Sequence, residues 1–330
     1  MNKLLSICIP SYNMEQYLHR CVDSMLVDEV LDRLEIIIVN DGSKDGTLAI
    51  ANDYKQRYPQ SVVVVDKPNG HYGSCVNAAL KVATGKYFRT VDADDWVDSQ
   101  ALATLVHKLS ELDVDCVCTK YATRWENGME VQPLDVPFNN VLDLNRYVLP
   151  ILDLRMHGLA YSTQLLRDIG YVQTEGICYT DNEYLYIPLA CARNIYFMDI
   201  VLYQYLVARD GQSMATEQRL KNDSHFYKIM DRLDSVHHSD LTFNQNEHRI
   251  WSFIQSNMIE WCAVVNIFYF EYNQAKEKKL RHVIAELRQE NALWFSGLWS
   301  KKRMIFFYLW YFSGDKLSKI IMKPFRKLKR

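Results

Sequence analysis

Residues 86–95 of the chain read Lys86-Tyr87-Phe88-Arg89-Thr90-Val91-Asp92-Ala93-Asp94-Asp95. The first six residues are typical of a buried strand, and three carboxylates follow where that strand must end. In an open α/β sheet, ligands bind beyond the carboxyl ends of the strands, where carboxylates hold a hard divalent cation together with substrate phosphates. The stretch therefore favours a nucleoside diphosphate ligand, although Asp-x-Asp also occurs in solvated surface turns.

Three earlier apolar stretches also end in polar turns, at Pro10-Ser11-Tyr12-Asn13, at Asn40-Asp41-Gly42-Ser43 and at Asn69-Gly70. We expect Pro10 to end the first strand, because proline cannot continue a central strand. Apolar residues recur at helical spacing between the strands, which predicts alternating strands and helices, a mostly parallel sheet and right-handed crossovers. All four polar turns then lie along one edge of the sheet.

These turns, in this order, resemble the motifs of the family 2 glycosyltransferases of the GT-A fold. The resemblance is close over about the first hundred residues and looser from His157 to Ser213. It implies an α/β fold, with a GT-A type, mostly parallel sheet flanked by helices and a C-terminal helical extension. It also implies an inverting transfer from a nucleotide-sugar, most simply a UDP-sugar, to a hydroxyl of a surface polysaccharide or lipid-linked glycan. The transferred group is then a hexosyl or N-acetylhexosaminyl unit.

The resemblance also assigns residues to the donor. It puts a divalent cation, Mn²⁺ or Mg²⁺, on Asp94, and it puts Asp41 on the N–H of the base and Asp92 on the ribose. His71 lies where relatives have a basic residue, but it is equally explained as a turn histidine in a Gly-rich loop. The other predicted donor-binding residues are Pro10, Ser11, Tyr12, Gly70, Arg209, Gln212 and Ser213. The last three belong to a polar loop that relatives close over the diphosphate, although such loop residues are often only solvated.

Asp181 is the candidate catalytic base. The resemblance implies this role, because relatives have Glu-Asp at the start of the corresponding helix. This chain has Thr180-Asp181, so the aspartate is kept and the preceding glutamate is replaced by threonine, which puts the contact of that neighbouring position in doubt. A carboxylate at that position would accept the proton of the attacking hydroxyl. The alternative interpretation is that Asp181 only caps the helix.

Other enzyme classes fit less well. A dinucleotide-dependent oxidoreductase needs G-x-G-x-x-G after the first strand, where this chain has Pro10-Ser11-Tyr12-Asn13. By resemblance to the haloacid-type phosphatases, their Asp-x-Asp motif should follow the first strand, whereas the motif of this chain follows the fourth. By resemblance to the sugar nucleotidylyltransferases, these enzymes have a Gly-rich, Arg-containing N-terminal loop that this chain lacks. A catalytically silent nucleotide-sugar-binding subunit of a membrane glycan-assembly complex stays open.

The length of 330 residues and the 48% of hydrophobic residues predict one large catalytic domain at 1–214 and a helical C-terminal region at 215–330. The eight cysteines form no CxxC pair, which favours reduced, buried thiols. The apolar run Leu4–Ile9 is too short for a secretory signal. We expect residues 125–145 to be a connecting loop. In a helix over 248–272, an apolar stripe indicates core packing, a homodimer contact, or a lipid or acceptor groove.

The net charge of −2 hides an asymmetry, because residues 301–330 carry +9 and the rest of the chain −11. Residues 304–312 are apolar and aromatic but shorter than the ~20 residues that span a bilayer. A basic, aromatic tail is typical of an interfacial anchor, which predicts a cytoplasmic protein held peripherally at the inner face of the cell membrane. The alternative is that the tail packs on the body. Nucleic acid is not an expected partner, because the body of the protein is acidic.

Overall fold

The computed structural model describes residues 3–207, 216–264, 274–290 and 311–312. The chain divides into two compact units, described here separately. Unit 1 comprises residues 1–213 and 238–247, and unit 2 comprises residues 214–237 and 248–330.

Unit 1 is built on one sheet with the strand order β3-β2-β1-β4-β9-β6-β10-β5, while β7 pairs with β6 and β8 with β10. The strands β1, β2, β3, β4, β6 and β10 all point the same way, and β9 runs antiparallel between β4 and β6. Their bounds are β1 Leu5–Ser11, β2 Leu34–Asp41, β3 Val62–Lys67, β4 Tyr87–Thr90, β5 Trp96–Val97, β6 Cys116–Trp125, β7 Gly128–Val131, β8 Val141–Asp143, β9 Leu159–Ser162 and β10 Asn194–Leu206.

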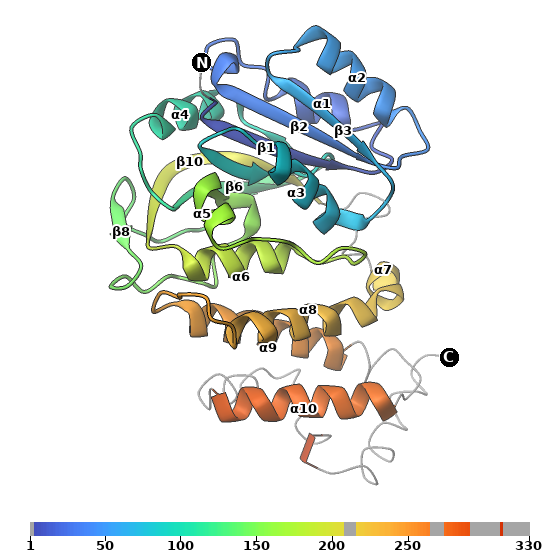
Figure 1. Ribbon diagram of the computed structural model, residues 1–330, viewed down its shortest axis with the longest axis vertical. Helices are drawn as coiled ribbons and strands as arrows, with labels where there is room; N and C mark the ends of the chain where they lie inside the picture. The colour runs from blue at the N-terminus through green and yellow to red at the C-terminus, as the bar shows by residue number, and fades with distance from the viewer. Residues whose placement is uncertain (1–2, 208–215, 265–273, 291–310, 313–330) are drawn as a thin grey trace. The chain divides into compact units, whose positions relative to one another are not determined.

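Helices cover both faces of this sheet (Figure 1). Leu5, Ile7 and Ile9 of β1 pack in one core cluster with residues of α1, α2 and α4, while α3 contacts β1 and β2 outside that cluster. Both faces are therefore buried, which explains the continuous apolar runs of β1 and β2. The bounds are α1 Leu18–Asp23, η1 Leu31–Arg33, α2 Thr47–Arg57, α3 His71–Val82, α4 Ser99–Leu109, η2 Met156–Gly158, α5 Thr163–Asp168 and α6 Asp181–Cys191.

The predicted mostly parallel α/β sheet is confirmed, with two local corrections. Pro10 lies inside β1 and pairs with Val39, so it does not end the strand. Pairing of β1 with β4 stops at Cys8 and Thr90, so Pro10 has a ladder partner on one side only and its missing N–H is tolerated. The expected loop at 125–145 also contains two short strands, β7 and β8, which pair with β6 and β10.

Residues 238–247 belong to unit 1 because two asparagines fix them there. The Asn244 side chain donates to the carbonyls of Leu189 and Ala192, both at 2.8 Å. The Asn246 side chain donates to the carbonyls of Leu144 and Tyr147 at 2.9 Å. These bonds satisfy carbonyls at the end of α6 and in the segment after β8.

Unit 2 is helical in its described part, with α7 Thr216–Lys221, α8 Asp223–His237, α9 Glu247–Val264, whose first residue belongs to unit 1, and α10 Gln274–Glu290. Gln255 of α9 donates to the carbonyl of Met230 at 3.1 Å, and Lys279 of α10 pairs with Asp231 at 2.6 Å. The predicted helix over 248–272 thus extends to Val264, and its continuation lies outside the described residues.

No helix in the described part is long and apolar enough to cross a membrane. None of the eight cysteines, all of which lie in the described part of the chain, forms a disulfide, and every one except Cys178 is buried. The basic tail lies outside the described residues apart from positions 311 and 312.

Candidate active site

The candidate site lies at the carboxyl edge of the sheet in unit 1, because the strands that point the same way end there together. β1 ends at Ser11 and is followed by Tyr12, whose side chain is 42% exposed. β2 ends at Asp41, β3 at Lys67, and β4 runs directly into Asp92–Asp95. The structure therefore brings the predicted turns to one edge.

Asp41 is nearly buried, and its carboxylate is paired with the ammonium group of Lys67, a residue to which the sequence alone assigned no role. Lys67 at the end of β3 donates to Asp41 Oδ1 at 2.5 Å and to Ser74 Oγ at 2.8 Å, and the backbone N–H of Gly70 donates to the same Oδ1 at 2.9 Å. A β-carbon at Gly70 would lie 2.7 Å from Ser74 Oγ. A residue with a side chain would thus crowd this network.

His71 begins α3 with φ +64°, a left-handed conformation that is uncommon for residues other than glycine. Its side chain is exposed, and its Nδ1 lies 3.8 Å from the Cys178 sulfur. Histidine is one of the residues enriched in this conformation, so the backbone fits both a donor contact and a turn residue. Its predicted contact with the donor stays a prediction.

The Asp92–Asp95 stretch crowds three carboxylates. Asp95 is almost fully buried and accepts from Tyr203 Oη at 2.6 Å and from the Leu206 backbone N–H at 2.7 Å. Burial, followed by the charges of Asp92 and Asp94, raises the pKa of the Asp95 carboxyl well above its ordinary value. Asp92 and Asp94 are both partly exposed, so a ligand can reach them.

A histidine from another part of the chain completes this cluster. Ligand atoms of Asp92, Asp95 and His157 all lie within 4.8 Å of one another. Burial, together with the charges of Arg155 and Arg89, lowers the pKa of His157 to about 3, so its ring is neutral at physiological pH. Its Nδ1 is buried and has no hydrogen-bond partner among the described residues.

This donor set fits a divalent cation. Carboxylate oxygens and a neutral imidazole nitrogen are ligands that Mn²⁺ accepts, and added positive charge would relieve the repulsion within the cluster. Asp94, the predicted metal ligand, is not part of the group of three. Its backbone carbonyl accepts from Arg20 at 2.6 Å, and its metal role stays a prediction.

Two tyrosine rings of β10 pack against the His157 ring. The His157 ring lies 4.7 Å from both the Tyr203 and Tyr205 rings, measured between ring centroids. Beneath it, the fully buried Arg89 donates to the carbonyl of His157 at 2.7 Å and so fixes η2.

Asp181 faces the same region. The pKa of Tyr205 is raised to about 12 by burial and then by the charges of Asp95, Asp92, Asp94 and Asp181, so all four carboxylates lie near this one phenol. The predicted cluster and the predicted base are therefore neighbours, although the chain separates Asp95 from Asp181 by 86 positions.

Asp181 is the first residue of α6, and the residue in the N-cap position is Thr180. Thr180 makes no side-chain capping hydrogen bond, and backbone N–H groups of Asp181 and Asn182 act on the Asp181 carboxyl, so the base and the cap interpretations both stay predictions. The Asp181 side chain is exposed to solvent, yet surrounding protein atoms partly desolvate it and raise the pKa of its carboxyl. Nearby backbone N–H groups and the charge of Arg155 act in the opposite direction. Because water reaches this carboxyl, we expect a smaller shift than in a closed interior.

Arg209, Gln212 and Ser213 lie outside the described residues, so their predicted contacts stay predictions. The sequence reading assigned no role to Lys67, Arg89, His157 or Tyr205. The available signal for Lys67 was its place at the end of a strand on the shared edge. His157 and Tyr205 could be associated with the carboxylates only through the paired register of β6, β9 and β10.

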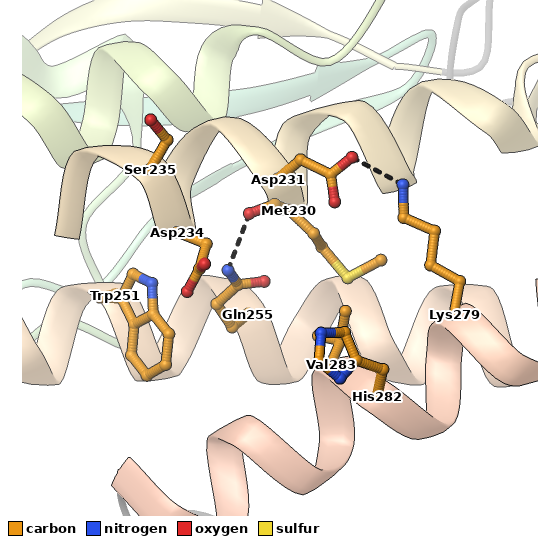
Figure 2. Close-up of a pocket in the computed structure, with 9 residues that line it drawn as sticks. All are labelled: Met230, Asp231, Asp234, Ser235, Trp251, Gln255, Lys279, His282 and Val283. Atoms are coloured by element: carbon orange, nitrogen blue, oxygen red, sulfur yellow. Dashed lines mark hydrogen bonds and ion pairs between the residues drawn. The ribbon is translucent and has the colours of Figure 1, made fainter. Parts of the chain in front are cut away.

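A second cavity lies in unit 2, among α8, α9 and α10 (Figure 2). Trp251 Nε1 and Gln255 Oε1 are buried there without hydrogen-bond partners in the described part of the chain. The cavity measures about 200 Å³, below the ~300–1,000 Å³ of typical ligand pockets. A nucleotide-sugar would not fit inside it.

Comparison with known proteins shows what the part of the chain that carries this edge-of-sheet site is similar to. The model described as glycosyl transferase family 2 matches residues 6–168. The chain is 28% identical over 304 residues to a poly(ribitol-phosphate) beta-glucosyltransferase from Bacillus spizizenii, covering 89% of this chain and 44% of that protein. It spans less than half the length of the first curated relatives that it matches.

Solved structures share the fold. TarS 1-349 from S. aureus in complex with UDP-GlcNAc aligns with a TM-score of 0.63 at 21% identity, over 87% of this chain and 81% of that one. The mannosyltransferase PcManGT from Pyrobaculum calidifontis, in complex with GDP-Man and Mn²⁺, aligns with a TM-score of 0.53 at 14% identity, over 99% and 86%.

Proposed function

The chain carries a glycosyl transferase family 2 domain at residues 6–168 and has the GT-A fold, and on this premise we propose that it is an inverting, metal-dependent glycosyltransferase. The donor is a nucleotide-sugar. UDP-sugars are the first donors to test, because the aligned TarS structure is a complex with UDP-GlcNAc. The acceptor is a hydroxyl of a surface polysaccharide or a lipid-linked glycan. The observation that carries the proposal is the convergence of Asp92, Asp94 and Asp95 with Asp181 near Tyr205.

Asp181 takes the proton of the acceptor hydroxyl as that oxygen attacks the anomeric carbon. The bond between this carbon and the diphosphate breaks on the opposite face, so the configuration inverts and the nucleoside diphosphate leaves. Burial raises the pKa of the Asp181 carboxyl, which makes it a stronger base than an ordinary aspartate.

Asp94 and Asp92, with His157 nearby, would hold a divalent cation, Mn²⁺ or Mg²⁺, whose charge would offset that of the leaving diphosphate. At the other end of the donor, Asp41 accepts the N–H of the base beside the exposed ring of Tyr12. Lys67 and the Gly70 N–H hold the Asp41 carboxylate in place. The donor thus extends along the carboxyl edge of β1, β2 and β4.

A panel of nucleotide-sugars tests the proposal. Purified protein is screened by thermal shift with each donor and Mn²⁺, and release of nucleoside diphosphate is then measured for the donors that stabilise it. We expect at least one UDP-sugar to raise the melting temperature and to be slowly hydrolysed only when a divalent cation is present. Binding without any turnover, with or without cation, would identify a silent nucleotide-sugar-binding subunit instead.

The location of the protein is a separate proposal, which the charge of residues 301–330 supports. These residues carry ten Lys or Arg against Asp315 alone, and each near-surface basic residue is worth ~1 kcal/mol on an anionic leaflet. We expect full-length protein to sediment with anionic vesicles at low salt and to be released at high salt. A chain ending at residue 300 should stay in solution while keeping UDP binding. Equal sedimentation of both forms would contradict membrane anchoring by the tail.

A further inference from the structure

An open groove lies beside the carboxylate cluster, in unit 1. It has a volume of about 450 Å³, which is within the range of small-molecule sites. Arg20 of α1, Trp96 of β5, and Arg124, Trp125 and Met129 of the β6–β7 hairpin line it. We call it the Arg–Trp groove. β6 ends at Trp125, so the groove opens on the same edge of the sheet as Asp92–Asp95.

The groove carries positive charge that the described part of the chain does not neutralise. Arg20 donates to the backbone carbonyl of Asp94 and stacks over the Trp96 ring at 4.1 Å. Arg124 donates through Nε to the amide oxygen of Gln204 at 2.7 Å. Neither arginine forms an ion pair with a carboxylate of the described residues, and the single acid lining the groove is the exposed Glu126. Neutral acceptors thus orient both guanidinium groups and leave their charge available to an anion.

The same groove offers apolar surfaces suited to a carbohydrate. Trp125 is 41% exposed and Met129 is 52% exposed, and both line the same groove, so together they offer apolar surface to a ligand there. The C–H face of a sugar ring or polyol is apolar and packs on an aromatic ring. A β-carbon at Gly128 would lie 2.6 Å from Trp125 Nε1, so the indole rests directly on the glycine backbone and is held in place.

The groove borders the transfer site directly. Arg20 contacts Asp94, and the backbone N–H of Leu206, another lining residue, donates to Asp95 at 2.7 Å. A chain lying in the groove therefore ends next to the carboxylates that the donor approaches.

We propose that the Arg–Trp groove is the acceptor subsite and that it selects an anionic glycan. Arg20 and Arg124 bind the negative groups of the acceptor chain, and Trp96 and Trp125 stack on its sugar or polyol units. This inference rests on the proposed function for its role in transfer, but the binding itself is measurable without turnover.

Three oligomers of similar length separate the sources of charge: oligogalacturonate for carboxylates, a polyol-phosphate oligomer for phosphodiesters, and maltohexaose as the neutral control. Calorimetry at low and high salt measures their binding to the full-length protein. We expect one anionic oligomer to bind, more weakly at high salt, and maltohexaose to bind at least about tenfold more weakly. Equal binding of maltohexaose would overturn the proposal, and so would no binding by either anionic oligomer.

Variants connect the binding to the groove. Arg124→Gln alone, and Arg124→Gln combined with Arg20→Gln, should each weaken the binding of the anionic oligomer. The double variant should weaken it by at least about tenfold. The exposed Trp125→Ala should weaken it without affecting the fold. Arg57→Gln on α2 is the matched control, because it removes an exposed arginine outside the groove, and it should bind like wild type.

UDP affinity in the presence of Mn²⁺ is measured for Arg124→Gln and Trp125→Ala, which do not contact Asp94, and should stay within about twofold of wild type. Loss of UDP binding in Arg124→Gln would assign the groove to the donor and overturn the acceptor role. Failure of the proposed function gives a different result, because anion binding in the groove would persist while no nucleotide-sugar is turned over.

Discussion

At the scale of single residues, Asp181 shows how the fold positions the proposed catalytic base. Asp181 is the first residue of α6, and its carboxyl is partly desolvated. The charges of Asp181 and of the Asp92–Asp95 cluster all act on the phenol of Tyr205. Thr180, in the N-cap position, makes no side-chain capping hydrogen bond, and backbone N–H groups of Asp181 and Asn182 act on the Asp181 carboxyl itself. The base and the helix-start interpretations of Asp181 therefore need an experiment that separates them.

Asp181→Asn tests the role of Asp181 as the base. The amide keeps the shape of the side chain but cannot accept a proton, so we expect the transfer rate to fall by ~10²–10⁴ while UDP binding and the melting temperature are unchanged. Steady-state kinetics and thermal shift measure both, with Asp168→Asn on α5 as a control that should retain wild-type rates. A wild-type rate in Asp181→Asn would exclude it as the base.

The pH dependence of kcat/KM gives a second test. Because Asp181 works only when ionised and its pKa is raised, activity should be lost as the pH falls, on an acid limb above the ordinary aspartate value of ~3.9. The positive charge of Arg155 lowers this pKa, so Arg155→Gln should move the limb to higher pH. An acid limb that moved to lower pH in Arg155→Gln would contradict the electrostatic account.

Asp94→Ala tests the predicted metal ligand. Removal of a partly exposed carboxylate at a strand end should abolish transfer and leave the fold intact, and UDP binding should no longer depend on Mn²⁺. Calorimetry of UDP binding with and without Mn²⁺ is the readout, and Asp113→Ala, which removes a fully exposed carboxylate after α4, is the control. Retained Mn²⁺ dependence would assign the cation to Asp92 and His157 alone.

At the scale of the elements, the segment between α5 and α6 positions Asp181, and α3 holds that segment. The Asn77 side chain donates to the carbonyl of Gln173 and accepts from its N–H, both at 2.9 Å, and Gly176 donates to the carbonyl of Gly70. A β-carbon at Gly73 would lie 2.2 Å from the carbonyl oxygen of Thr174. Glycine is required there by this close approach.

Gly73→Ala should therefore destabilise the fold, even though alanine normally favours a helix. The overpacked contact is expected to cost about 1–3 kcal/mol and to displace the segment before α6, so the melting temperature and the transfer rate should both fall. Lys81→Ala, exposed on the same helix, is the control and should change neither. A Gly73→Ala variant as stable and as active as wild type would show that this contact is not tight.

The sequence predicted the elements whose patterns are local. Apolar runs ending in Asp41 or Asp92 identified β2 and β4, because buried parallel strands have continuous apolar stretches. The position of Pro10 within β1 and the existence of β7 and β8 could not be predicted, because both depend on which strand lies alongside. His157 and Tyr205 join the site for the same reason: strand pairing, which is non-local, brings them to Asp92 and Asp95.

At the scale of the whole molecule, different positions along one edge of the sheet in unit 1 carry the residues predicted for donor, cation and acceptor. The ends of β1, β2 and β3 carry the residues predicted for the nucleotide, the end of β4 carries the carboxylates, and the ends of β6 and β10 border the Arg–Trp groove. Donor and acceptor would thus approach from the two sides of Asp94. The helices of unit 2 carry none of these residues in their described part.

The central claim is a direct displacement with Asp181 as the single base, and the anomeric configuration of the product tests it most directly. Proton NMR of the glycoside formed from an α-linked UDP-sugar measures this configuration through the coupling constant of the anomeric proton. The account predicts a β-glycoside with wild-type protein and no glycoside above background with Asp181→Asn. An α-glycoside would contradict it, because a single back-side displacement at the anomeric carbon must invert the configuration.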